Sequence, residues 1–225
     1  MMKKITIVIL LSLLLAGCFL PETIIDWVDF VKFDDTTYMS NYSKELASEQ
    51  ALGEVVSVVK FKLDGNITNS SYRSKNGDAS YREKGTKIYE VKGAEGVYAV
   101  KDPQNKINGY QIYEENGNHR FENVEQRDIY KVEIHEMLSL GGYRFVNKLE
   151  SEADIQAFLA LLNDSEETLD FEPNFENRDP NYFEVLFYHD GPLVDRYTIC
   201  FDGSTYYWYP FEVAVLTEEM ANYMQ

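Results

Sequence analysis

The sequence predicts an α+β fold that consists mostly of antiparallel β-strands. Short runs rich in β-branched and aromatic residues recur along the chain. Asp-Gly or Asn-Gly pairs, which favour tight reversals between antiparallel strands, begin at residues 64, 76, 108, 116, 190 and 202. One strongly patterned helix follows in the second half. We therefore expect a small β-rich domain or barrel over 24–116 and an antiparallel sheet packed by one or two helices over 117–225.

The first half is expected to contain several strands and one brief helix. The strands are predicted over 24–33, 37–39, 54–63, 86–92, 96–101 and 110–114. Ser43 and Gly53 are suitable as the cap and the end of a short helix over 43–52. In 54–63 the spacing predicts that Val55, Val59, Phe61 and Leu63 share one face, and that Asp64-Gly65 ends the strand in a hairpin. The polar residues 66–83 are expected to form a long surface loop.

The second half alternates strands with helices. Strands are predicted over 129–137, 143–149, 182–189, 193–201 and 205–209. Ser151 begins the clearest helix, because Asp154 occupies the capping-box position and apolar residues follow at helical spacing. Thr217 is expected to cap a final helix that packs through Met220, Tyr223 and Met224.

The first eighteen residues have the layout of an export signal. Lys3 and Lys4 precede an apolar run over 5–15, which is too short for a permanent transmembrane helix. The run ends in Leu15-Ala16-Gly17-Cys18, which resembles the lipobox of bacterial lipoproteins. An ordinary secretory signal cut elsewhere and a buried apolar helix are the alternatives, but neither calls for a cysteine at this place.

The resemblance implies that 1–17 is removed and that Cys18 becomes the lipidated first residue of the mature protein. Two acyl chains would anchor it durably, whereas one holds only marginally. The tether over 18–23 is short, since five extended residues reach at most ~18 Å. We therefore expect the folded part to lie close to the outer surface of the cell membrane.

A second resemblance covers about residues 27–114. The segments Leu52-Gly53-Glu54-Val55, 85–93 (GTKIYEVKG) and 97–100 (VYAV) are similar to an uncharacterised exported domain of lipoproteins from Bacillus-like bacteria. These segments contain turn and strand residues and no catalytic residue. The resemblance implies a cell-surface location and supplies no activity.

Charge and cysteine content narrow the classes of function. Processing at Cys18 would leave 19 basic residues against 38 acidic ones, a net charge of −19. Such a surface repels phosphate backbones, so nucleic-acid binding is excluded. Cys200 would be the only thiol left, so no intramolecular disulfide can form, and we interpret it as a small packed side chain.

No metal or catalytic motif stands out. His119, His135 and His189 lack metal-ligand spacing, and His189 with Asp190 is interpreted as a pair beside a turn. A calcium site is conceivable in the acidic segment 164–170, but a solvated loop suits its composition better. The sequence therefore predicts no cofactor and no metal.

The most unusual segment of the mature chain is Tyr206-Tyr207-Trp208-Tyr209. On a strand, Tyr206 and Trp208 share one face and Tyr207 and Tyr209 the other. They could all be core residues, or an exposed face could bind a sugar, another small molecule or a partner.

Three functions remain open. The first is a non-enzymatic, lipid-anchored interaction module that contacts another envelope protein or a cell-wall component. The alternative is a glycan- or small-molecule-binding lipoprotein that uses the aromatic strand. A hydrolase with an unrecognised carboxylate pair is the third.

Overall fold

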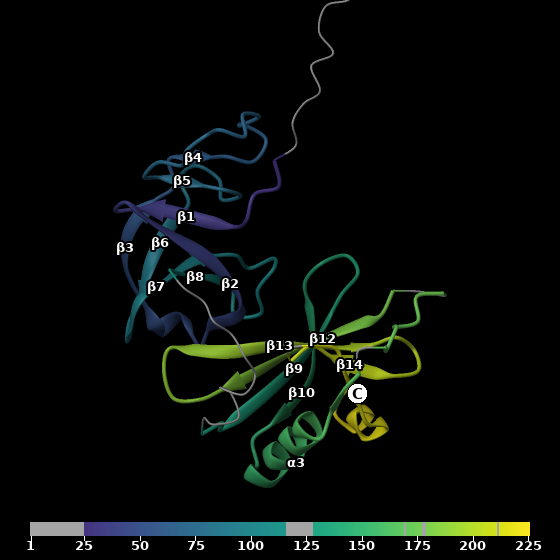
Figure 1. Cartoon of the computed structure of the whole chain (residues 1–225). Coiled ribbons are helices and arrows are strands. Elements are labelled where there is room, and N and C mark those ends of the chain that lie inside the picture. Colours follow the sequence, from purple (N-terminus) through teal and green to yellow (C-terminus); the bar gives the residue numbers. More distant parts are fainter. Residues whose placement is uncertain (1–24, 116–127, 169, 177–178, 211) are drawn as a thin grey trace, which may run out of the picture.

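The computed structural model describes residues 25–115, 128–168, 170–176, 179–210 and 212–225 (Figure 1). It confirms the predicted fold, because these described residues form an open and mostly antiparallel sheet together with a single α-helix. The predicted signal peptide, Cys18, the tether, His119 and the predicted boundary near residue 116 lie outside the described residues. Among the described residues, no helix has the length and apolar character needed to span a membrane.

Nine strands form the continuous path of the sheet. Their order is β10 (Tyr143–Leu149), β9 (Lys131–Met137), β12 (Asn181–Tyr188), β13 (Leu193–Phe201), β2 (Thr36–Leu46), β8 (Tyr110–Glu114), β7 (Ala94–Lys101), β6 (Lys87–Val91) and β3 (Leu52–Val58). The long strand β2 pairs with β8 through Met39, Ser40, Asn41 and Glu45, and with β13 through its last three residues. This strand therefore links the two halves of the chain.

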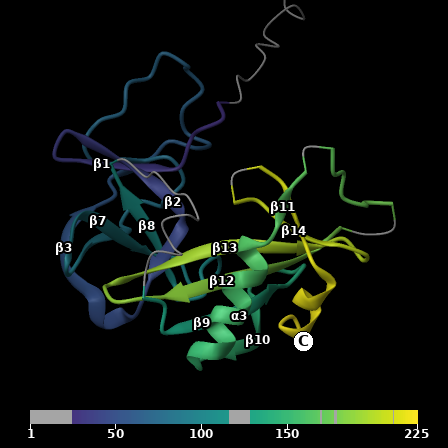
Figure 2. The same cartoon turned by 60° about the horizontal axis from the view of Figure 1, so that its bottom comes forward.

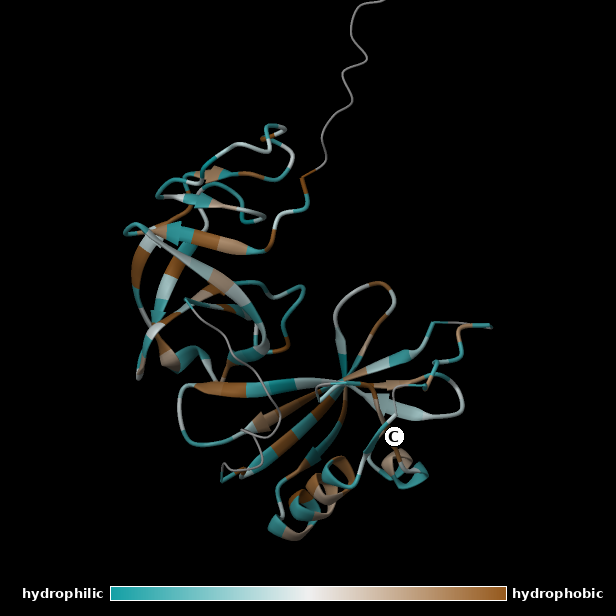
Figure 3. Ribbon diagram, viewed as in Figure 1, coloured by the Kyte–Doolittle hydropathy of each residue, from teal (hydrophilic) through white to brown (hydrophobic). Residues whose placement is uncertain are grey.

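The N-terminal strands roll around a small core. Strand β1 (Phe30–Phe33) pairs with β2 and with β5 (Asp78–Ala79), and β5 pairs in parallel with β4 (Phe61–Lys62). The side chains that they enclose are Val31, Phe33, Tyr38, Val59, Ala79, Ile88, Val100 and Tyr113. Figures 1 and 3 show this roll above the C-terminal strands.

The C-terminal sheet has one apolar face and one polar face. Helix α3 (Glu152–Asn163) packs on the apolar face together with the 3₁₀-helix η2 (Glu218–Asn222), as Figure 2 shows from below. Strands β14 (Tyr206–Trp208), β15 (Ala214–Leu216) and β11 (Glu166–Glu167) extend this sheet. Because side chains alternate along a strand, Phe183, Val185 and Phe187 pack toward α3, and the residues between them face the N-terminal roll.

The helix predicted over 43–52 is wrong. Residues 43–46 belong to β2, and only a 3₁₀-turn, η1 (Glu49–Ala51), follows. Pairing with β13 gives these backbone groups hydrogen-bond partners far along the chain, whereas an isolated short helix is marginal in water. The final helix is a 3₁₀-helix, and Met220 and Met224 pack on the core as predicted.

The strand predicted over 54–63 is also interrupted. β3 pairs with β6, the chain leaves the strand at Val59, and β4 then pairs with β5. Val55 and Phe61 are consequently exposed, whereas Val59 and Leu63 are buried, so the predicted single face is wrong. The turn at Asp64-Gly65 does not close a hairpin. The surface loop predicted over 66–83 contains β5, which is buried because it lies between β1 and β4.

Candidate functional site

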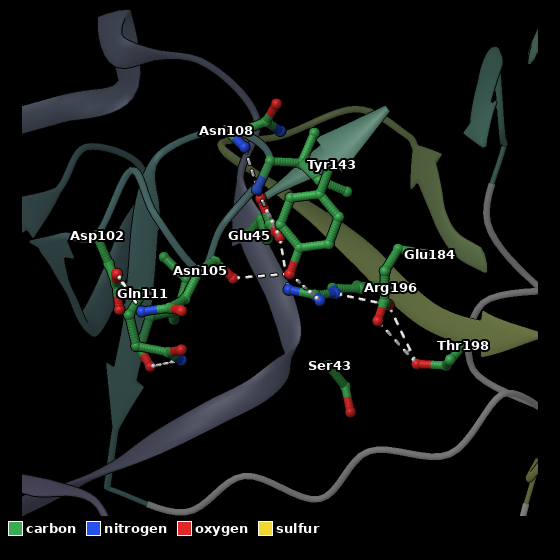
Figure 4. A network of polar contacts seen from close by, with 12 residues as sticks. Ser43, Glu45, Asp102, Asn105, Asn108, Gln111, Tyr143, Glu184, Arg196 and Thr198 are labelled. Carbon is green, nitrogen blue, oxygen red and sulfur yellow. Dashed lines mark hydrogen bonds and ion pairs between the residues drawn. The ribbon is translucent and has the colours of Figure 1, made fainter. Parts of the chain in front are cut away.

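A polar pocket lies between the N-terminal roll and the polar face of the C-terminal sheet. Its volume is about 600 Å³. The residues lining it are Asp29, Tyr42, Ser43, Tyr81, Arg82, Asp102, Asn105, Lys106, Gln111, Glu184, Arg196, Tyr197, Thr198, Tyr209 and Pro210. They come from segments spread over most of the described chain, and Figure 4 shows the network that connects several of them.

Strand alternation brings the C-terminal side chains to the pocket. Glu184 of β12 lies between the core residues Phe183 and Val185, so its carboxylate points away from α3. Arg196 and Thr198 do the same on β13, where Glu184 and Thr198 are direct cross-strand partners. The sheet therefore places the carboxylate of Glu184 next to the guanidinium of Arg196 on its polar face.

Arg196 is the centre of the network. Its Nε donates to Glu184 Oε2 at 2.8 Å, its Nη1 donates to Glu45 Oε1 at 2.8 Å and its Nη2 donates to the Tyr143 hydroxyl at 2.9 Å. Thr198 Oγ1 donates to Glu184 at 3.1 Å. Burial lowers the pKa of Arg196, but the hydrogen bond and charge of Glu184 and the charge of Glu45 outweigh this effect and raise it. The guanidinium is therefore a permanent and firmly held cation.

Glu45 fixes the loop between β7 and β8. Its fully buried carboxylate accepts from the backbone N–H of Ile107 at 3.3 Å and from that of Asn108 at 2.7 Å. The same carboxylate binds Arg196 of β13. One side chain thus connects β2, the loop 102–109 and the C-terminal sheet.

A second network closes the N-terminal side of the pocket. Arg82 donates to Asp102 Oδ2 at 2.7 Å and to the Tyr113 hydroxyl at 2.6 Å, and Nη2 lies 3.5 Å from Asp29 Oδ2. The Tyr113 hydroxyl in turn donates to Asp29 at 3.0 Å. Burial and the charge of Asp29 raise the pKa of Tyr113, so its hydroxyl stays protonated.

Lys106 differs from both arginines. Its side chain is only 4% exposed, and its Nζ lies 5.3 Å from the centre of the Tyr42 ring. Within the described residues, Nζ makes neither a hydrogen bond nor an ion pair. Burial and, next, the charge of Arg196 lower the pKa of Lys106 to about 8, although Glu45 and other acids oppose this.

Comparisons of the chain with protein-family models, curated proteins and solved structures found no match. The chemistry of the pocket therefore carries the functional argument. The pocket offers hydrogen bonds and charge to a small ligand through Arg82, Arg196, the ammonium of Lys106 and several carboxylates. Among the described residues, no group of three or more His, Cys, Asp or Glu side chains could hold a metal ion.

The aromatic strand is divided between the core and the pocket. Trp208 is 1% exposed, packs in the α3 core and donates from Nε1 to Ser165 Oγ at 3.0 Å. Tyr207 is buried on the opposite face, and Tyr206 is half-buried and stacks on Phe201. Tyr209 is exposed and lines the pocket. Of the four residues selected from the sequence, only Tyr209 therefore lies at the polar pocket.

The remaining candidates lie elsewhere. Burial raises the pKa of Cys200 to about 11, which makes this thiol unreactive at neutral pH. His189 Nε2 lies 3.0 Å from Asp195 Oδ2 across the β12–β13 hairpin, and its Nδ1 contacts the carbonyl of Asp190. None of these residues lines the pocket.

Sequence reasoning missed the pocket because its residues are far apart in the chain. One signal was present: Glu184 is a lone carboxylate within the apolar strand 182–188, and an acid at such a position needs a buried partner. No sequence pattern identified Arg196 as that partner. None identified Lys106 as a pocket residue either, because the composition of its loop is that of an ordinary polar turn.

Proposed function

We propose that this protein is a lipid-anchored, extracytoplasmic binding protein whose pocket takes a small polar molecule such as a glycan unit. The observation that carries the proposal is the pocket between the two halves, with charged side chains on its walls and tyrosines at its mouth. Its volume of about 600 Å³ lies in the usual range for small-ligand sites.

The tyrosines support a ligand with a flat or ring-shaped body. Tyr42, Tyr81 and Tyr209 line the pocket and remain 62%, 40% and 54% exposed. Exposed rings next to fixed hydrogen-bonding groups suit sugars, since the ring stacks while hydroxyls bond to the charged side chains. No enzymatic role is proposed.

A titration of the purified ectodomain, residues 19–225, tests this function. Glucose, cellobiose and N-acetylglucosamine oligomers serve as probes, and amide chemical shifts report where each binds. Tyr42→Ala and Tyr209→Ala should weaken binding by about tenfold each, since a stacked ring contributes roughly 1 kcal/mol or more. Tyr130→Ala, which removes a tyrosine of 54% exposure away from the pocket, is the control. Equal losses in all three variants would count against the pocket.

The proposed anchor is tested separately. Cells are labelled with palmitate while they express the wild type or Cys18→Ala. We expect label in the wild type alone, because the resemblance to a lipobox implies that the acyl chains are attached to Cys18. Equal label in both would remove the membrane attachment from the proposal.

A second candidate is the interaction module that contacts another envelope protein. The tip of the β9–β10 hairpin favours it, because Leu140 is fully exposed and Leu138 is 42% exposed beside it. In-cell crosslinking followed by mass spectrometry, with Cys18→Ala as a secreted control, tests this candidate. One partner captured by the wild type and lost in Leu140→Ser would support it, and a partner unaffected by Leu140→Ser would exclude the tip.

A further inference from the structure

The pocket contains three cations, and two of them are already neutralised. Arg82 has Asp102 at 2.7 Å, and Arg196 has carboxylates of Glu45 and Glu184 at 2.8 Å. Their charges are thus matched within the fold. Lys106 is the lining cation that has no such partner among the residues the structure describes.

The position of Lys106 is fixed by its backbone. Its N–H donates to the Asp102 carbonyl at 3.1 Å and its carbonyl accepts from Gly109 at 3.1 Å. The next two backbone N–H groups are held by the buried Glu45. The backbone of Lys106 is therefore held, and because its side chain is only 4% exposed and lines the pocket, a partner for the ammonium has to enter the pocket.

An ammonium on a side chain that is only 4% exposed is costly when it has no hydrogen bond or ion pair, because burial removes part of its hydration. The Tyr42 ring and the more distant charges of Glu45, Glu184 and Asp102 replace this hydration only in part. A site of this kind gains free energy when a ligand supplies the missing acceptor. A carboxylate suits it best, since one negative charge pairs with one ammonium. A doubly charged phosphate would bring a second negative charge, for which no cation is left, since both arginines lining the pocket already have carboxylate partners.

We propose that Lys106 is the ligand-anchoring residue of the pocket and that its ligand is a ring-bearing monocarboxylate, of the class of acidic sugars. The Tyr42 ring, which lies beside the ammonium, packs against the ligand ring while the carboxylate pairs with Nζ. This inference rests on the proposed binding function and adds the charge of the ligand to it.

Calorimetry with matched acids and amides tests the anchor. Glucuronate is compared with glucuronamide, and benzoate with benzamide, because each pair differs only in the charge at one group. The wild type should bind each acid at least about tenfold more tightly than its amide, as expected for a partly buried ion pair.

Two variants make the comparison specific. Lys106→Met removes the charge and keeps much of the volume, and it should abolish the preference for the acid. Lys101→Met removes an exposed lysine at the end of β7, outside the pocket, and should leave the preference unchanged. Circular dichroism of both variants verifies that they are folded.

The outcomes separate the anchor from the binding function. If the amides or neutral sugars bind as tightly as the acids, the pocket binds ligands and the role of Lys106 is wrong. An acid preference that survives in Lys106→Met overturns the anchor as well. If neither acids, amides nor neutral sugars bind, both the anchor and the proposed function are overturned.

Discussion

The carboxylate of Glu45 accepts a hydrogen bond from the guanidinium of Arg196 at 2.8 Å, although 151 positions separate the two residues in the sequence. Both side chains are buried, Glu45 completely. The contact lies where β2 pairs with β13 and where the loop 102–109 is held. It therefore connects the stability of the fold with the shape of the pocket.

Glu45→Gln should destabilise the protein by about 3 kcal/mol, since removal of one partner leaves the other charge buried and less well paired. Thermal or urea unfolding measures the loss. Glu54→Gln, an exposed acid on β3, is the matched control and should change the free energy of unfolding by less than about 0.5 kcal/mol. Similar stability of the two variants would show that the Glu45–Arg196 contact contributes little.

Lys106→Met should leave the empty protein as stable as the wild type or stabilise it by roughly 1 to 3 kcal/mol at pH 7, because it removes a buried charge without an ion-pair partner. Chemical denaturation measures the difference. A clear destabilisation of the variant would mean that the ammonium has a stabilising partner in the fold.

The effect of Lys106→Met should also depend on pH. The pKa of Lys106 is lowered to about 8 by burial and by Arg196, against the charges of Glu45, Glu184 and Asp102. The unfolded chain then binds more protons between pH 8 and its normal lysine pKa near 10.5, so the wild type gains stability as pH rises through this window. The advantage of the variant should consequently shrink from pH 7 to pH 10, and a constant difference would contradict the lowered pKa.

Trp208→Ala and Tyr209→Ala should behave in opposite ways, although the residues are adjacent. Trp208 fills the α3 core, so its loss should cost about 3 to 5 kcal/mol. Tyr209 is exposed at the pocket, so its loss should change the free energy of unfolding by no more than about 0.5 kcal/mol. Equal destabilisation in urea unfolding would show that Tyr209 is also a packing residue.

Glu133 should stabilise the protein in a pH-dependent way. His135 and the hydrogen bonds from Lys131 and Tyr188 outweigh burial and lower the pKa of Glu133 to about 2. A carboxylate with a lowered folded-state pKa contributes stability above its unfolded pKa, near 4.5, and loses it as pH falls toward 2. Glu133→Gln should therefore be less stable than the wild type by about 1 kcal/mol at pH 7, after allowance for partial solvent screening.

Denaturation at several pH values measures this effect. The difference between wild type and Glu133→Gln should shrink between pH 5.5 and pH 2.5. A difference that stays constant over this range would contradict the prediction, because it would show that folding does not lower the pKa of Glu133.

The strand-rich fold, most strand positions and the helix that begins after Ser151 could be predicted from the sequence. These features depend on turn residues, side-chain alternation and capping, which act over a few neighbouring positions. The helix predicted over 43–52 was wrong because such local signals cannot reveal pairing with a distant segment. Residues 44–46 pair with β13, which lies far along the chain.

The tertiary structure alone decided the pocket. Arg82, Lys106 and Arg196 line it without a shared motif, and Glu45 binds Arg196 beside it. These residues come together because β2 joins the two halves of the sheet. The burial of Lys106 and the state of its ammonium depend on the low-dielectric surroundings that this meeting creates. Local sequence patterns determine where the strands form, whereas long-range packing determines which charged side chains are buried and which partners they meet.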